Sequence, residues 1–319
     1  MKRISFYLLT VFILLLQSCT KEERVPCKSE LLLRFRYTLN NQNVNLFGEQ
    51  IKRITVYVFD RNGKYVDSFT DSGNHLTNDY VMHLSLPVGK YSVVVYGGNF
   101  TTYSTGELNS LNLLNQTLRK GITDINDFRT ELKNRSGTDP FLYPVSTPDD
   151  LYAAMTVNVA STYDNKIVTN VDLIKNTKKI TVKILGTSNI SAPPEVYILA
   201  QNGRYGYDNS IDAASGVFKY SPVNTLTQYD YTQAELKILR LMLGQSPMLV
   251  VRNSMTHEVI YNENMIDQIL STKKYVSQED FDRENEFVFE IKINPGGVDV
   301  GISVFINGWK IHHINPDVS

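Results

Sequence analysis

The side chains that most often perform catalysis occur in this sequence but do not stand in catalytic spacings. No HExxH zinc motif is present, and the neighbours His312 and His313 would point to opposite faces of a strand. There is no CxxC pair and no GxSxG nucleophile turn, and Gly97-Gly98 lacks the spacing of a phosphate-binding loop. We therefore expect no enzyme, no catalytic residue, no metal site and no cofactor. The histidines are His75, His83, His257, His312 and His313.

Acidic residues gather at two places in the chain. Asp149-Asp150 forms one pair, and Asp280, Asp282 and Glu284 alternate further along. Alternating carboxylates can bind Ca²⁺, but the glycine that an EF-hand loop requires is missing here. We interpret the second group as a solvated loop.

Two of the nineteen tyrosines cluster in the segment Gly203-Arg204-Tyr205-Gly206-Tyr207-Asp208. Aromatic rings can stack on sugars, so Tyr205 and Tyr207 are candidates for a glycan-binding surface. Tyrosine is also favoured in strands, and packing in the core or in a loop is the simpler interpretation. The sequence leaves both open.

Only Cys19 stands in a pattern that assigns it a reaction. Two basic residues precede an apolar run, Ile4–Leu16. This run is shorter than the roughly 20 residues of a spanning helix but typical of a secretory signal peptide. Leu16-Gln17-Ser18-Cys19 resembles the bacterial lipobox, in which the thiol receives diacylglycerol and the leader is cut before the cysteine. We predict a signal peptide at residues 1–18 and acyl chains on Cys19 that hold the chain at a membrane.

The charged residues directly after Cys19 indicate where the protein is sent. Lys21, Glu22 and Glu23 resemble the short acidic export signal of Bacteroidetes lipoproteins that reach the outer leaflet of the outer membrane. A solvated linker is the alternative, since charged residues often follow a lipidated cysteine. We expect residues 19–28 to form a lipidated linker and the protein to be displayed on the cell outer membrane.

Composition excludes some partners. Cleavage after residue 18 leaves 301 of the 319 residues. It removes two of the 32 basic residues and none of the 33 acidic ones, so the net charge changes from −1 to −3. That balance gives no electrostatic footprint for nucleic acid.

With Cys19 acylated, Cys27 has no intramolecular partner. It is then a free thiol, an intermolecular partner or a further acylation site.

Residues 29–172 carry the alternation of half-buried strands. Leu31, Leu33, Phe35 and Tyr37 share one face of a predicted first strand, Leu31–Thr38. Asn62-Gly63 supplies turn chemistry between two further strands. The predicted strands that follow are Ile51–Asp60, Tyr65–Phe69, Tyr80–Leu86, Tyr91–Tyr96, Met155–Ala160 and Ile167–Leu173.

Residues 173–319 form a second block with a similar density of strands, and the boundary lies near residue 172. Two short helices are predicted, Asp124–Lys133 with Asp124 as its cap and Asn264–Leu270. The sequence thus predicts an all-β protein of two tandem sandwiches with a few short helices. The strands of the second block are Ile180–Leu185, Glu195–Leu199, Val217–Tyr220, Leu236–Leu243 (which also suits a helix), Met248–Arg252, Phe287–Ile293 and Ile302–Ile314.

Several segments in this order resemble one protein family. They begin with LLLRFRYTLN, ITVYVFDRNGKYV and LPVGKYSVVVYGGN, and continue with Asp150-Leu151-Tyr152, Asn202-Gly203-Arg204-Tyr205, Phe281-Asp282-Arg283 and the ending VFINGW. The set is similar to the FimB/Mfa2 family, the anchor subunits of Bacteroidetes type V fimbriae. Tyr96 departs from the tryptophan that is usual at that position.

The resemblance implies two transthyretin-like β-sandwich domains and assembly by β-strand addition. Shaft subunits of such fimbriae lose their first strand, and the C-terminal strand of a neighbour fills the groove. An anchor keeps its first strand and its lipid and donates a strand to the shaft subunit. Here the donor candidate is Ile302–Ile314, with Gly308 as hinge; its insertable side chains are Val304, Ile306, Trp309 and Ile311. In the alternative, this tail closes its own sandwich.

The resemblance therefore implies a lipid-tethered outer-membrane anchor that holds the base of a fimbrium and limits fibre growth. One alternative is a processed minor or tip fimbrillin of the same fold. The other is a glycan-binding surface lipoprotein that uses Tyr205 and Tyr207.

The lipid tether makes the first testable prediction. The native protein should begin at acylated Cys19, and Cys19→Ala should abolish both leader cleavage and acylation and release the chain from its normal membrane. Mass spectrometry and membrane fractionation measure this. An unchanged acylated product in the variant would refute the tether, and a native protein that starts near residues 35–55 would instead support the processed fimbrillin.

Overall fold

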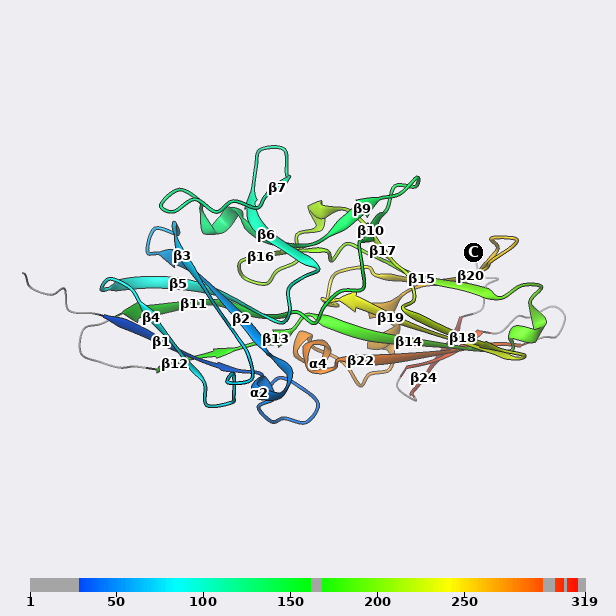
Figure 1. Cartoon of the computed structure of the whole chain (residues 1–319). Helices are drawn as coiled ribbons and strands as arrows, with labels where there is room; N and C mark the ends of the chain where they lie inside the picture. Colours follow the sequence, from blue (N-terminus) through cyan, green and yellow to red (C-terminus); the bar gives the residue numbers. More distant parts are fainter. Residues whose placement is uncertain (1–28, 162–167, 295–301, 307–308, 315–319) are drawn as a thin grey trace, which may run out of the picture.

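The structure is a computed structural model that describes residues 29–161, 168–294, 302–306 and 309–314. Its regular structure is mainly β-strand, arranged in five sheets along an elongated molecule, with β1 towards one end and β24 towards the other (Figure 1). The predicted all-β class with a few short helices is confirmed.

The N-terminal sandwich consists of a three-stranded and a five-stranded sheet. Alternate side chains of both sheets meet in one buried core, which contains Leu33, Phe35, Val56 and Val95. The three-stranded sheet has the order β12 (Val168–Asp172), β1 (Glu30–Arg36), β4 (Val81–Ser85). The five-stranded sheet has the order β13 (Ile174–Lys175), β11 (Tyr152–Ser161), β5 (Gly89–Gly97), β2 (Arg53–Asp60), β3 (Tyr65–Ser72).

The central strands of the five-stranded sheet are buried on both faces. Val56 and Val58 of β2 face the N-terminal core, whereas Tyr57 and Phe59 belong to a second core on the other face. This second face is covered by a four-stranded sheet, whose Phe128 ring lies 4.9 Å from the Tyr57 ring centroid. The four-stranded sheet has the order β16 (Arg204–Gly206), β8 (Phe128–Leu132), β6 (Tyr103–Leu108), β7 (Leu114–Asn115).

Two six-stranded sheets form the C-terminal sandwich, and their facing side chains continue the second core. The sheet that we call the β15 sheet has the order β21 (Val259–Asn264), β20 (Met248–Asn253), β15 (Pro194–Ala200), β17 (Phe218–Tyr220), β10 (Leu142–Pro144), β9 (Asn134–Ser136). The β14 sheet has the order β18 (Asn224–Gln228), β19 (Tyr231–Leu239), β14 (Thr177–Leu185), β22 (Glu286–Ile293), β23 (Ile302–Ile306), β24 (Trp309–Ile314).

Strands from both sides of residue 172 pair with each other. β8 pairs with β16, and β10 pairs in parallel with β17. The segment between β5 and β11 therefore leaves the N-terminal sandwich and joins the sheets of the other half (Figure 1).

The predicted helix at Asp124–Lys133 is wrong in most of its length. Asp124 does cap a helical turn, the 3₁₀ helix η1 (Ile125–Asp127), by accepting from the Asn126 amide. The chain then becomes β8, because Phe128, Thr130 and Leu132 alternate into the core while the backbone pairs with strands on both sides. Residues 236–239 belong to strand β19.

The other short helices lie mostly in the C-terminal half. The predicted helix at Asn264–Leu270 is confirmed as α3 (Met265–Ser271), with the Asn264 side chain as its cap. The acidic residues interpreted as a solvated loop instead form α4 (Gln278–Arg283), which begins with a capping box of Ser277 and Asp280. The remaining helices are α2 (Phe47–Gln50), η2 (Thr187–Asn189) and η3 (Ala213–Ser215).

A buried charge cluster fixes α4 to the β14 sheet. The Arg240 guanidinium makes a bidentate ion pair with Asp282, with N–O distances of 2.7 and 2.6 Å. The Lys178 ammonium is fully buried and donates to the carbonyl oxygens of Asp282 and Glu284 at 3.0 and 2.6 Å. Burial lowers the pKa of Lys178 from 10.5 to about 7, although Asp282 acts in the opposite direction.

The free energy of unfolding should therefore depend on pH through Lys178. Above pH 7 the folded protein binds fewer protons than the unfolded chain, so stability should rise between pH 7 and 10, by at most about 1.4 kcal/mol per pH unit. Chemical denaturation at several pH values gives the slope of the free energy of unfolding against pH for the wild type and for Lys178→Met. The difference between the two slopes is the contribution of Lys178. The matched control is Lys179→Met at the exposed neighbouring position, which should leave the slope unchanged. A Lys178→Met variant that follows the wild-type slope would contradict the prediction.

Candidate functional site

The first strand occupies the middle of the three-stranded sheet. β1 pairs in parallel with β12 and antiparallel with β4. The side chains of Leu31, Leu33 and Phe35 are at most 1% exposed, and the Phe35 and Phe47 rings stack at 5.7 Å. Each such side chain contributes about 1.5–3 kcal/mol by leaving water. β1 thus fills the place that would otherwise be an apolar groove between β12 and β4.

Both ends of β1 are tied to neighbouring segments. The Ser29 hydroxyl donates to the Leu86 carbonyl just before the strand begins. At the other end, Arg36 makes a bidentate ion pair with Asp172 of β12, with N–O distances of 2.7 and 2.8 Å. Both side chains of this pair are exposed, so it fixes the register more than it stabilises the fold.

Tyr37 joins the first strand to the C-terminal half. Its ring is fully buried and packs edge-on against Tyr152 at 5.1 Å, and its hydroxyl accepts from the Asn285 amide at 2.8 Å. Burial raises the pKa of Tyr37 to about 12, so the phenol stays protonated and neutral at physiological pH. Asn285 directly precedes β22, so this contact links β1 to the β14 sheet.

The loop after β1 reaches the same region. The Asn41 amide donates to the Glu284 carboxylate at 2.7 Å, and the Arg283 guanidinium donates to the Asn43 side-chain oxygen. These contacts were not foreseen from the sequence, because loop residues far apart in the chain carry no periodicity. The sequence did predict that Tyr37 lies on the same face as Leu33 and Phe35, but not its contact with Asn285.

The donor candidates lie in a hairpin at the edge of the β14 sheet. β23 pairs antiparallel with β22, and β24 pairs only with β23 among the described strands. The register brings Val304 opposite Ile311 and Ile306 opposite Trp309. The structure thus gathers the four candidates into two cross-strand pairs, with β24 at the end of the molecule remote from β1 (Figure 1).

Other predicted site residues lie outside the described residues. These are the lipid-attachment candidate Cys19, the export-signal candidates Lys21, Glu22 and Glu23, and the hinge candidate Gly308. Within the described ranges, no helix combines the length and the apolar character needed to cross a membrane.

The tyrosine cluster does not form a sugar platform. Tyr205 belongs to β16, has no exposed surface, and its hydroxyl accepts from the Arg240 amide at 3.0 Å. Tyr207 is half-buried and packs against the same core. A buried ring offers no face to a ligand, so the glycan surface proposed for this pair is wrong at Tyr205.

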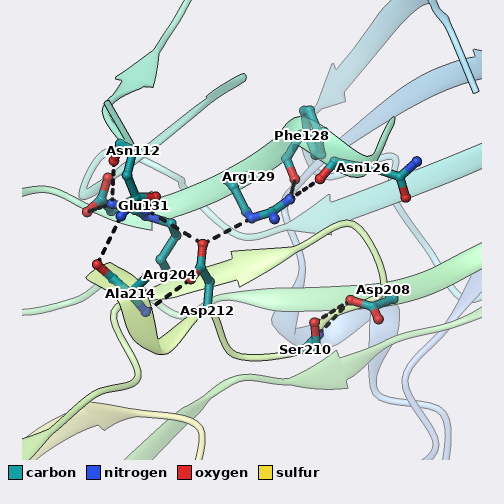
Figure 2. Close-up of polar contacts among 10 residues, drawn as sticks. All are labelled: Asn112, Asn126, Phe128, Arg129, Glu131, Arg204, Asp208, Ser210, Asp212 and Ala214. Carbon is teal, nitrogen blue, oxygen red and sulfur yellow. Dashed lines mark hydrogen bonds and ion pairs between the residues drawn. The ribbon is translucent and has the colours of Figure 1, made fainter. Parts of the chain in front are cut away.

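Arginines beside this cluster brace the four-stranded sheet (Figure 2). Arg204 is buried and donates to the Asn112 side chain at 2.8 Å and to Glu131 at 3.3 Å. Asp212 accepts from Arg129 at 3.2 Å and lies 3.5 Å from Arg204. Each guanidinium therefore faces a carboxylate, and the cluster holds β8 and β16 together.

The acidic pair Asp149-Asp150 is likewise structural. The Asp150 carboxylate lies 3.0 Å from the Lys175 ammonium and 2.8 Å from that of Lys237. Burial alone would raise its pKa, but the two lysines lower it below its ordinary value. In the part of the chain that the structure describes, no group of three or more His, Cys, Asp or Glu side chains could hold a metal ion.

Several solved structures share this fold. A candidate adhesin of Bacteroides thetaiotaomicron is 26% identical, with a TM-score of 0.73 over 91% of this chain and 99% of that chain. A candidate polysaccharide-binding protein of the same organism is 22% identical, with a TM-score of 0.73 over 91% and 99%. The fimbrial anchor protein Mfa2 of Porphyromonas gingivalis is 19% identical, with a TM-score of 0.72 over 90% and 100%.

No curated protein matches the chain. The model of one protein family does match, and it covers residues 23–315, which include the first strand, both sandwiches and the C-terminal hairpin. The chain belongs to the family of fimbrillin-A associated anchor proteins Mfa1 and Mfa2.

Proposed function

We propose that this chain is a lipid-tethered anchor subunit that holds the base of a fimbrial shaft at the outer membrane and limits growth of the fibre. A fimbrium-associated role follows from membership of the anchor family. The tether, the strand donation and the limit on growth are the new parts of the proposal.

The position of β1 is the observation that carries the proposal. A shaft subunit accepts its neighbour because its first strand has been removed. Here β1 fills that position between β12 and β4 with its apolar side chains buried. A subunit whose groove is closed accepts no further strand, so polymerisation stops at its own end of the fibre.

The position of the proposed tether supports the same orientation. Cys19 lies ten residues before Ser29 in the chain, and ten extended residues span at most about 36 Å. Acyl chains on Cys19 would therefore keep the β1 end of the molecule near the membrane. The hairpin of β23 and β24 lies at the opposite end (Figure 1), where a shaft subunit would meet it.

The hairpin also suits donation because β24 is an edge strand. Releasing it breaks one ladder of hydrogen bonds, whereas releasing β1 would break two. In the proposed mechanism β24 leaves β23, with Gly308 as the hinge, and Trp309 and Ile311 enter pockets of the shaft subunit. In the alternative, the hairpin stays in place and closes the β14 sheet.

A disulfide across the hairpin separates these two mechanisms. Phe305→Cys with Lys310→Cys, in a Cys27→Ser background, should lock β24 to β23, because the two residues are opposite in register and neither is one of the four insertable side chains. Under oxidising conditions the locked cells should shed fimbriae into the medium, and a reductant should restore retention. Electron microscopy and immunoblots of cells and medium measure the effect.

Each single cysteine variant is the control and should retain its fimbriae. Locked cells that keep their fimbriae as well as these controls would contradict release of β24.

The proposed export signal can be tested separately from anchoring. Replacing Lys21, Glu22 and Glu23 by alanine should leave Cys19 acylated but hold the protein on the periplasmic leaflet. Protease added to whole cells should then no longer digest it. If digestion matches that of the wild type, these residues form only a linker.

A further inference from the structure

Strand β18 is an open edge of the β14 sheet. All five of its residues, Asn224–Gln228, are exposed, and its neighbour on one side only is β19. Leu226 is 48% exposed, and Tyr229 directly beyond the strand is 90% exposed. A row of backbone amides and carbonyls along this edge therefore has no neighbouring strand among the residues that the structure describes.

Folded proteins usually protect such edges with charged side chains, proline, bulges or covering segments. β18 has none of these within its length, and the sequence from Ser221 to Tyr229 contains no charged residue. Every other described edge strand of three or more residues carries an acidic, basic or histidine residue. These strands are β12, β4, β3, β16, β21, β9 and β24. The absence of protection at β18 is thus specific to this edge.

The sequence of β18 is complementary to itself. In an antiparallel pair of two copies with Leu226 on the two-fold axis, Leu226 lies opposite Leu226, Asn224 opposite Gln228, and Thr225 opposite Thr227. Amide pairs, threonine pairs and apolar pairs are all favourable across strands, and no like charges meet. We propose that two copies of this chain associate through β18, joining two β14 sheets into one continuous sheet.

The backbone direction fits this register. Gln228 and Tyr231 are opposite each other across the two-residue turn Tyr229-Asp230, and such a turn is closed by a hydrogen-bonded pair. Because successive amides of a strand point to opposite sides, those of Asn224, Leu226 and Gln228 point to β19, and those of Thr225 and Thr227 face the open edge. In the proposed register the two Thr225–Thr227 pairs exchange hydrogen bonds between the copies, and Leu226 lies opposite its own copy in a non-hydrogen-bonded pair. Such an isologous contact closes on itself as a dimer. It involves neither β1, the lipid nor the C-terminal hairpin.

Cysteine crosslinking in cells tests the contact with the full-length chain. In a non-hydrogen-bonded antiparallel pair, opposite Cα atoms lie about 4.5 Å apart, a separation that a disulfide spans. Leu226→Cys in a Cys27→Ser background should therefore form a covalent dimer on mild oxidation. Met255→Cys is the matched control, because Met255 is 75% exposed in another turn, and it should give only background dimer.

The register has its own test. Thr225→Cys alone should crosslink poorly, but mixed expression with Thr227→Cys chains should give the dimer. Leu226→Lys would place two ammonium groups opposite each other and should raise the dimer dissociation constant by about tenfold or more. Sedimentation of the full-length protein in detergent measures that change.

Three results would overturn the proposal. They are a Leu226→Cys dimer no stronger than that of Met255→Cys, a crosslink to a different protein in place of the dimer, and sedimentation that Leu226→Lys leaves unchanged.

Discussion

The structure depends on one constraint, which is that β2 and β5 carry apolar side chains on both faces. A sheet of this kind must be covered twice. The three-stranded sheet with β1 at its centre covers one face, and the four-stranded sheet with Phe128 covers the other. The first layer makes β1 part of the core, and the second draws β16 from the C-terminal half against β8. The burial of β1 between β12 and β4 and the pairing of strands from the two halves thus both follow from the two apolar faces of β2 and β5.

The sequence predicted the elements whose side chains alternate, because a buried face imposes its period directly on the residues. β1 and β4 lie where alternation placed them, and β2 lies where a run of β-branched and aromatic residues placed it. The same parity also predicts an inward position for Lys178, which continues the series of Ile180, Val182 and Ile184 on β14. That signal was available but was not used, since a lysine is seldom fully buried.

Other features could not be predicted because they depend on distant segments. Residues 128–132 suit a helix when taken alone, but pairing with β6 and β16 makes them a strand. Tyr205 resembles an exposed loop residue until β8 and Arg240 enclose it. For the candidate site, the importance of β1 was predictable from its pattern. Its links to α4 and β22, through Tyr37, Asn41 and Asn285, require the folded chain.

The placement of β1 between two strands has a mechanical consequence. A pull on the chain before Ser29 acts along the axis of β1, so it loads the ladders to β12 and β4 lengthwise and must shear their hydrogen bonds together. A pull on the free end of β24 acts on a hairpin whose last residue pairs with the first residue of β23. It therefore peels the pairs apart one at a time. The same molecule thus resists force strongly at its first strand and yields to it step by step at its last.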